Sequence, residues 1–248
     1  MGSLDQKVIA VTGAAGAIGR AAVSAFKREG AVVVGVDLRH AEDTGADEFI
    51  CCDLTVEDQV RDLYVGVVEE FGRIDGLFNN AGVALAEDTS VLGEDLAVFD
   101  RTLRINVHSV FLCCKHGIPH LIASGGGAVV NTASLVASKG SAVSQIGYTA
   151  SKGAVVSMSR EMAVEFARKG VRVNTLSPGP VESPMLDSLF SDDQIARRMV
   201  HVPAGRFGTA EEMAEAALFL LSDASSFVNG VELIVDGGIS AAYVTPED

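Results

Sequence analysis

The sequence predicts an α/β protein: one doubly wound domain in which helices cover both faces of a seven-stranded parallel sheet. Short apolar runs rich in valine and isoleucine alternate with helical patterns along the 248 residues. A glycine-rich turn at 13–19 joins the first apolar run to the first helical pattern. No linker-like stretch interrupts this alternation, so we expect residues 1–248 to form a single domain.

The expected strands are short apolar runs, each followed by a residue type that ends strands, such as glycine, aspartate, asparagine or serine. They cover residues 7–12, 31–36, 48–52, 74–78, 128–133, 171–176 and 231–235. Helical patterns occupy most of the segments between them. Thr209 with Glu212 has the spacing of a capping box, and we expect Thr55 with Asp58 to cap a helix in the same way.

Composition excludes several classes of partner. The formal net charge of −14 disfavours nucleic acids and anionic membranes, because both are polyanions. The longest stretch without a charged residue, 116–138, is broken by Pro119 and by three consecutive glycines, so it is not a membrane span. We see no secretory signal at the N-terminus. These observations predict a soluble, cytoplasmic protein.

The cysteines and histidines predict neither disulfides nor a metal site. The cysteines form two adjacent pairs, 51–52 and 113–114, without the spacing of a redox or zinc motif. We therefore expect buried free thiols in a reducing compartment. His116 and His120 lie four residues apart, but no third ligand accompanies them, so a packed or surface pair is favoured.

Tyr148 and Lys152 are the first candidates for chemistry. In a helix, residues four apart stand on the same face, one turn apart. A lysine ammonium stabilises a phenolate, which brings the tyrosine pKa down from its usual value near ~10. Ser134 ends the strand at 128–133, where its hydroxyl could hold a substrate oxygen beside Tyr148. The set suits proton transfer to or from an alcohol or carbonyl, although such a pair alone also occurs on many surface helices.

The glycine-rich turn predicts a dinucleotide site. Gly13 permits a sharp turn, small residues let the backbone approach a pyrophosphate, and the following helix presents free N–H groups to its charge. Asp37 ends the second strand, where a carboxylate can accept hydrogen bonds from ribose hydroxyls and repel a 2′-phosphate. NAD is therefore favoured over NADP. Arg39 is the counter-argument, because an arginine there could reach a phosphate.

Three asparagines leave alternatives open. Asn79 and Asn80 precede a small-residue turn and could hydrogen-bond the backbone of neighbouring loops, but a plain turn is an equal interpretation. Asn106 falls inside the helical pattern at 96–123. Most such residues are solvated or bonded to their own helix, whereas a buried one could distort the helix and bind a water molecule.

Taken together, the sequence resembles the single-domain short-chain dehydrogenases/reductases over essentially its whole length. The resemblance is carried by the ordered glycine turn, Asp37, Asp53-Leu54, Asn79-Asn80-Ala81-Gly82, Asn106, Ser134, Tyr148-x-x-x-Lys152, Pro178-Gly179 and Asp236-Gly237-Gly238. It implies a Rossmann-type oxidoreductase that interconverts a secondary alcohol and a ketone with NAD, and a homotetramer. The irregular segment at 184–206 would be a substrate lid.

The resemblance also implies a role for each matching residue. The catalytic set would be Asn106, Ser134, Tyr148 and Lys152, with Tyr148 as general acid/base and Asn106 holding a water that links Lys152 to solvent. The cofactor set would be Gly13, Gly16, Ala17, Ile18, Gly19, Asp37, Asp53, Leu54, Asn80, Ala81, Gly82, Tyr148, Lys152, Pro178, Gly179, Val181 and Ser183.

Three positions depart from the family pattern. Alanine stands at position 17, where the family has glycine, so we expect a slightly displaced loop that still binds the cofactor. The spacing from Ser134 to Tyr148 is one residue longer than usual, which makes Ser138 a minor rival. Ser183 replaces a threonine and keeps the hydroxyl.

Two other functions remain as alternatives. One is an NADPH-dependent 3-oxoacyl carrier-protein reductase, against which the acidic net charge and the missing NADP signature count, because carrier proteins are acidic too. The other is a noncatalytic NAD-binding regulator, which the intact catalytic set disfavours.

Overall fold

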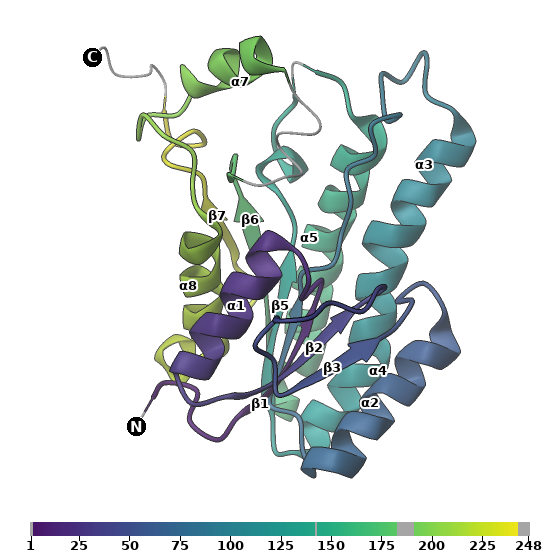
Figure 1. The fold of residues 1–248 in the computed structure, drawn as a ribbon, viewed down its shortest axis with the longest axis vertical. Coiled ribbons are helices and arrows are strands. Elements are labelled where there is room, and N and C mark those ends of the chain that lie inside the picture. The colour runs from purple at the N-terminus through teal and green to yellow at the C-terminus, as the bar shows by residue number, and fades with distance from the viewer. Residues whose placement is uncertain (1, 142, 183–190, 243–248) are drawn as a thin grey trace.

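The computed structural model describes residues 2–141, 143–182 and 191–242. Within these residues the strands form one seven-stranded parallel sheet in the order β3-β2-β1-β4-β5-β6-β7 (Figure 1). The strands are β1 (Val8–Thr12), β2 (Val32–Asp37), β3 (Glu48–Cys51), β4 (Gly76–Asn79), β5 (Gly127–Thr132), β6 (Val171–Pro178) and β7 (Glu232–Val235). The predicted fold class is confirmed, and each strand agrees with its expected range to within about two residues.

Helices cover both faces of this sheet (Figure 1). On one face, a hydrophobic core forms beneath α2 (Glu57–Phe71), α4 (Ser109–Ala123) and α5 (Ile146–Phe166). On the other face, a second core forms beneath α1 (Ala17–Arg28) and α8 (Ala210–Leu221). Because both faces are covered, the central strands read as continuous apolar runs, and all five residues of β1 are buried.

The remaining described elements lie around this frame. A π-helical segment, η1 (Arg104–His108), separates α3 (Leu96–Leu103) from α4. The short helix α7 (Asp192–Met199) lies above the carboxyl ends of the strands (Figure 1). The 3₁₀ turns are η2 (Leu135–Ala137), η3 (Ala167–Lys169) and η4 (Asp223–Ser225). In the described part of the chain, no helix is long and apolar enough to cross a lipid bilayer.

The strand order creates a crevice at the carboxyl end of the sheet. The chain runs outward from β1 to β2 and β3, and then returns to β4 on the opposite side of β1. The loops after β1 and β4 therefore leave in opposite directions, and such a switch point is where open parallel sheets bind ligands. Most of the predicted functional residues end or follow one of the strands β1 to β6, and Asn106, Tyr148 and Lys152 lie on η1 and α5. The fold brings these segments to this edge.

The two predicted helix caps have different outcomes. Thr209 and Glu212 form the expected capping box of α8. The prediction for Thr55 and Asp58 is wrong, because α2 begins after Val56 and has no side-chain cap. The Thr55 hydroxyl instead donates to the Asp53 carboxylate at 2.8 Å.

The four cysteines are free, as expected, but they are not all buried. Cys51 is exposed because it ends β3, the strand at the edge of the sheet. Burial raises the pKa of Cys52 to about 11 and that of Cys113 to about 12. These two thiols therefore stay protonated at neutral pH, which suits packing and not nucleophilic chemistry.

Candidate active site

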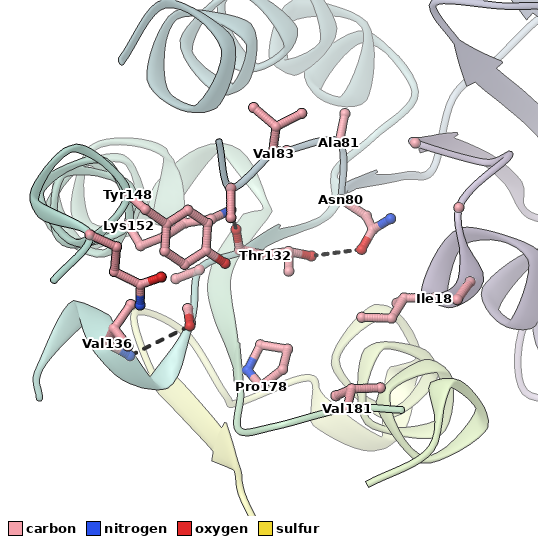
Figure 2. A pocket seen from close by; sticks show the side chains of 18 of the residues that line it. Ile18, Asn80, Ala81, Val83, Thr132, Val136, Tyr148, Lys152, Pro178 and Val181 are labelled. Carbon is pink, nitrogen blue, oxygen red and sulfur yellow. Dashed lines mark hydrogen bonds between the residues drawn. The ribbon is translucent and has the colours of Figure 1, made fainter. Parts of the chain in front are cut away.

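A cavity of about 1480 Å³ occupies the carboxyl edge of the sheet. Figure 2 shows Tyr148 and Lys152 on one side of it and Ile18 and Val181 on the other. The predicted site residues that line it are Gly13, Gly16, Ala17, Ile18, Asp37, Asp53, Leu54, Asn80, Ala81, Gly82, Ser134, Tyr148, Lys152, Pro178, Gly179 and Val181. Gly19 and Asn106 lie behind this wall, and Ser183 falls outside the described residues.

The glycine turn has the geometry expected of a phosphate cradle. Gly13 adopts φ +68°, which favours glycine, and a Cβ on Gly19 would come within 2.0 Å of the Gly13 carbonyl oxygen. Gly16 is the N-cap of α1 and supplies no side-chain cap, and the first turn holds no acidic residue. Ala17 and Ile18 begin the helix at the cavity wall. This helix start has free N–H groups and no acidic side chain, so it can receive an anion.

Asp37 is fixed beside that cradle. One carboxylate oxygen accepts from the Ala15 N–H at 3.1 Å, and the other accepts from the Leu38 N–H at 2.8 Å. These bonds hold the charge at the cavity wall, next to the glycine turn. Arg39 lines the same end of the cavity with an exposed side chain.

Asp53 and Leu54 line the cavity just after β3, and Asp53 is held by its own turn. Its Oδ1 accepts from both the backbone N–H and the hydroxyl of Thr55, at 2.9 and 2.8 Å. Leu54 is 8% exposed and places an apolar side chain next to that carboxylate. A polar group beside an apolar surface is the kind of environment that suits one edge and one face of a purine ring.

The asparagine turn after β4 is an organised polar junction. The Thr12 hydroxyl accepts from the N–H groups of Asn80 and Ala81, at 3.0 and 3.1 Å. The Thr132 hydroxyl donates to the Asn80 side chain at 3.4 Å (Figure 2). Neither alternative describes this arrangement, because the Asn80 side chain bonds a side chain of β5 and not the backbone of a loop. The residues that anchor this turn, Thr12 and Thr132, were not predicted because they come from other strands.

Asn79 and Asn131 continue that junction into the core. The Asn79 amide donates to Asn131 Oδ1 at 2.8 Å, and the Asn131 amide donates to the Ser159 hydroxyl at 2.9 Å. All three side chains are at most 2% exposed. The pairs tie β4, β5 and α5 together directly below the cavity, which fixes the strand ends from which the site residues extend.

Asn106 is fully buried in η1 and clamps the next loop. Its Oδ1 accepts from the Val83 N–H at 2.8 Å, and its Nδ2 donates to the Val83 carbonyl at 2.8 Å and to the Ser151 hydroxyl at 3.0 Å. The helix is distorted into a π-helical segment here, which agrees with the alternative of a buried asparagine. The side chain, however, bonds protein groups from two other elements, which the sequence did not indicate.

Tyr148 and Ser134 lie together in the cavity wall. Tyr148 lies in the first turn of α5, and the Ser134 side chain also accepts from the Val136 N–H at 3.5 Å (Figure 2). Burial raises the pKa of Tyr148, and a hydrogen bond with the Ser134 hydroxyl opposes that change. Ser138 is exposed and does not line the cavity, so the geometry favours Ser134 over its rival.

Lys152 stands one turn from Tyr148, as predicted, with its ammonium nitrogen 5.7 Å from the centre of the tyrosine ring. It donates to the Thr132 carbonyl at 2.8 Å, and burial lowers its pKa from 10.5 to about 8. The expected lowering of the Tyr148 pKa by Lys152 is not found in this structure, because Nζ is directed to that carbonyl and burial of the phenol dominates.

The histidine pair has an explanation outside the cavity. His116 Nε2 lies 3.1 Å from a carboxylate oxygen of Glu57, which also pairs with Lys115. Among the described residues, no group of three or more histidine, cysteine, aspartate or glutamate side chains is arranged to hold a metal ion.

The family described as enoyl-(acyl carrier protein) reductase matches residues 13–240. The chain belongs to this family, and it is a short-chain dehydrogenase/reductase, an oxidoreductase that acts on CH–OH groups.

Particular relatives show how broad the family's substrates are. The chain is 40% identical to the D-threitol dehydrogenase of Mycolicibacterium smegmatis, over 95% of this chain and 93% of that one. It is 35% identical to the 3-oxoacyl-[acyl-carrier-protein] reductase FabG of Thermotoga maritima, over 95% and 98%. A crystal structure of a short-chain dehydrogenase/reductase from Burkholderia xenovorans matches with a TM-score of 0.93 and 36% identity, over 98% of this chain and 99% of that one.

Proposed function

We propose that this protein is an NAD-dependent dehydrogenase that interconverts a secondary alcohol and a ketone. The observation that carries the proposal is the convergence of Tyr148, Ser134 and Lys152 in the same cavity as the glycine turn and Asp37. Four separate segments contribute to this set: α5, the end of β5, the glycine turn and β2. A tyrosine–lysine pair that occurred by chance on a helix would not be accompanied by the other three. The curated relative that acts on D-threitol, at 40% identity, supports an alcohol as substrate.

The described residues fit a nicotinamide dinucleotide. The uncapped start of α1 would hold the pyrophosphate, Asp37 the adenosine ribose, and Asp53 with Leu54 the adenine. Pro178, Gly179 and Val181 would line the nicotinamide end, where Gly179 is fixed by donating its N–H to the Val235 carbonyl at 2.9 Å. When bound, the cofactor supplies the hydride acceptor or donor, and the protein supplies position and proton transfer.

The side chains divide the remaining work. Ser134 binds the substrate oxygen, and Tyr148 removes its proton during oxidation or returns it during reduction. Lys152 brings a positive charge next to the phenol and a donor to the ribose hydroxyls. Asn106 keeps the Val83 loop and Ser151 in place, and Ser151 in turn donates to the Tyr148 carbonyl at 2.7 Å. A water on this helix distortion would connect Lys152 to solvent.

The choice of NAD over NADP rests on Asp37. Its carboxylate is hydrogen-bonded to the glycine turn and would meet a 2′-phosphate as a like charge. Arg39 is near enough to line the same end of the cavity, so the preference is a balance between these two residues. Titration of the purified protein with NADH and with NADPH, followed by fluorescence, measures it. Tighter binding of NADH supports Asp37 as the selector, and tighter binding of NADPH contradicts it.

A specific observation favours a second candidate, the NADPH-dependent 3-oxoacyl carrier-protein reductase. Lys139, Arg197 and His201 line the cavity with side chains that are exposed. The two cationic side chains, Lys139 and Arg197, could receive an acidic carrier despite the net charge of −14. Acetoacetyl thioesters separate the candidates, because rapid reduction with NADPH and no alcohol oxidation with NAD⁺ would favour the reductase.

The third alternative, a noncatalytic NAD-binding regulator, gains no support, because the complete set of proposed catalytic residues is present.

The proposed function also includes an oligomeric state and a lid over the cavity. We infer a homotetramer of single-domain subunits, supported by large apolar side chains that are exposed on outer helices, among them Phe111 on α4 at 50% and Val164 on α5 at 81%. Sedimentation at several concentrations tests that state. The lid predicted at 184–206 lies partly outside the described residues; its described helix, α7, lines the cavity and would cover the substrate end. The free thiols suit a cytoplasmic location.

The direct test is oxidation of a panel of secondary alcohols, followed as NADH formation. Linear and cyclic diols belong in the panel because a relative acts on D-threitol. Turnover of at least one alcohol with NAD⁺, and slower turnover with NADP⁺, supports the proposal. Absence of turnover by a protein that binds NADH tightly would contradict it.

A further inference from the structure

The N-terminus of α5, the helix that carries Tyr148 and Lys152, is capped from far away in the sequence. Its N-cap residue, Gln145, makes no side-chain cap. The Ile146 N–H instead donates to the Thr89 carbonyl at 3.2 Å. The Gly147 N–H donates to Asp88 Oδ1 at 3.0 Å, and the Tyr148 N–H donates to Asp88 Oδ2 at 2.6 Å. One carboxylate thus receives two consecutive N–H groups, including that of Tyr148.

Asp88 is built into this position. Its side chain is buried, with 8% of the residue exposed, and its own N–H donates to the Leu85 carbonyl at 3.1 Å. A Cβ on Gly147 would lie 3.3 Å from Asp88 Oδ2 and 3.4 Å from Cβ of Thr102. The absence of a side chain at residue 147 therefore lets the carboxylate reach the helix backbone. A buried carboxylate is costly unless it is hydrogen-bonded, and both oxygens are.

The segment that carries Asp88 is also fixed at its other end. Val83 begins it, directly after the asparagine turn, and both backbone polar groups of Val83 are bonded to Asn106. Residues 83–88 therefore connect the turn on the cofactor side of the cavity to the backbone of Tyr148. A displacement at either end would move the phenol relative to Ser134.

We propose that Asp88 is a positioning residue for Tyr148, acting through the backbone of α5 to hold the phenol at the reacting atoms. The proposal rests on the proposed function, in which Tyr148 transfers the proton. Near-attack geometry is sensitive to displacements of about 1 Å, which can cost about a hundredfold in rate. Two hydrogen bonds to the first turn are a direct way to prevent such a displacement.

The carboxylate also affects the proton affinity of the phenol. The Ser134 hydroxyl is hydrogen-bonded to the Tyr148 phenol, and the Lys152 ammonium lies 5.7 Å from the centre of its ring. The Asp88 carboxylate binds the backbone N–H of Tyr148, and the uncharged Thr102 and Phe99 of α3 lie against Gly147, one residue earlier. A helix N-terminus favours a phenolate, and the negative charge of Asp88 offsets that effect. Removal of the charge should therefore move the midpoint of the pH profile of kcat for alcohol oxidation to lower pH.

Asp88→Ala, Asp88→Asn and Gly147→Ala test the proposal, with Asp95→Ala as the matched control. Asp95 also caps a helix with its carboxylate, accepting from the Ala97 N–H at 2.9 Å, but α3 carries none of the proposed proton-transfer residues. Each variant is assayed for kcat, KM for NAD⁺, NADH binding and thermal stability. NADH binding counts the folded sites, so a loss of folded protein is not mistaken for a loss of rate.

The expected result is a tenfold to hundredfold fall in kcat per NADH-binding site for Asp88→Ala, with KM for NAD⁺ within about twofold. Asp88→Asn should lose less rate, because it keeps one acceptor, and should show the shifted pH midpoint. Gly147→Ala should lose rate while remaining folded, and Asp95→Ala should lose stability only.

An unchanged kcat and pH midpoint in Asp88→Ala, whatever its melting temperature, would overturn the proposal. That outcome is distinguishable from failure of the proposed function by Tyr148→Phe. If Tyr148→Phe is inactive and Asp88→Ala is normal, only the positioning role fails. If Tyr148→Phe retains normal turnover, the proposed function fails, and the positioning role fails with it.

Discussion

Lys152→Met should make the protein more stable at neutral pH while removing its activity. Lys152 is 3% exposed, and burial lowers its pKa from 10.5 to about 8. At pH 7 the folded protein therefore holds a buried charge that the unfolded chain would hold in water. The difference in pKa corresponds to a cost of about 3 kcal/mol. Methionine has a similar length and no charge, so it removes this cost.

One interaction opposes the gain. Lys152 donates to the Thr132 carbonyl at 2.8 Å, and methionine would leave that buried oxygen without this donor, at a cost of about 1–2 kcal/mol. The variant should therefore be about 1–2 kcal/mol more stable than the wild type at pH 7. This size is measurable by urea unfolding without cofactor.

The pH dependence gives the prediction its sign. Between pH 8 and 10.5 Lys152 is protonated in the unfolded chain but has released its proton in the folded protein. The free energy of unfolding of the wild type therefore rises with pH through that window, because the cost of the buried charge is lost. The advantage of Lys152→Met should therefore shrink from pH 7 to pH 10 and disappear or reverse there. A variant that is less stable than the wild type at pH 7, or a difference that does not change with pH, would refute the reasoning.

Three further predictions concern single side chains. Asp37→Ala should weaken NADH binding by at least about tenfold, because the ribose loses its hydrogen-bond acceptor. It should weaken NADPH binding much less, because the charge that repels the 2′-phosphate is also removed, and equal losses in the two titrations would contradict this. Asn106→Ala should lower the free energy of unfolding by about 1–3 kcal/mol, since it leaves the partly buried N–H and carbonyl of Val83 without these partners. A loss below about 0.5 kcal/mol in urea unfolding would be inconsistent with the clamp. Thr209→Ala should cost about 1 kcal/mol by removing the capping box of α8, with activity retained at temperatures where the variant is folded; no change in melting temperature would argue against that cap.

The sequence predicted the strands well because the central ones are buried on both faces and each strand ends at a distinct residue type; the edge strands β3 and β7 are only partly buried. It also predicted the meeting of Tyr148, Lys152 and Ser134, since two of them are one helical turn apart and the third ends a neighbouring strand. The capping box at Thr209 was predicted correctly by spacing. The same spacing was misleading at Thr55, because the nearby Asp53 carboxylate competes for its hydroxyl and α2 begins one residue later.

What the sequence could not indicate are contacts between distant segments. Asp88 and Tyr148 are 60 residues apart, and no periodicity connects a loop carboxylate to a helix start elsewhere. The hydrogen bond between Asn106 and Val83 likewise joins segments that no sequence pattern connects. The pKa of Tyr148 was also mispredicted, because the burial that raises it depends on the whole fold around the phenol and not on the spacing to Lys152.

The central claim is that Tyr148 transfers the proton in an NAD-dependent reaction on an alcohol. The most direct measurement is the rate of NADH formation by wild type and Tyr148→Phe on the same secondary alcohol, with both proteins matched for bound NADH. The account predicts that the variant binds NADH as tightly as the wild type and loses at least about a hundredfold in kcat, because phenylalanine cannot accept the proton. A Tyr148→Phe protein with wild-type turnover would contradict it.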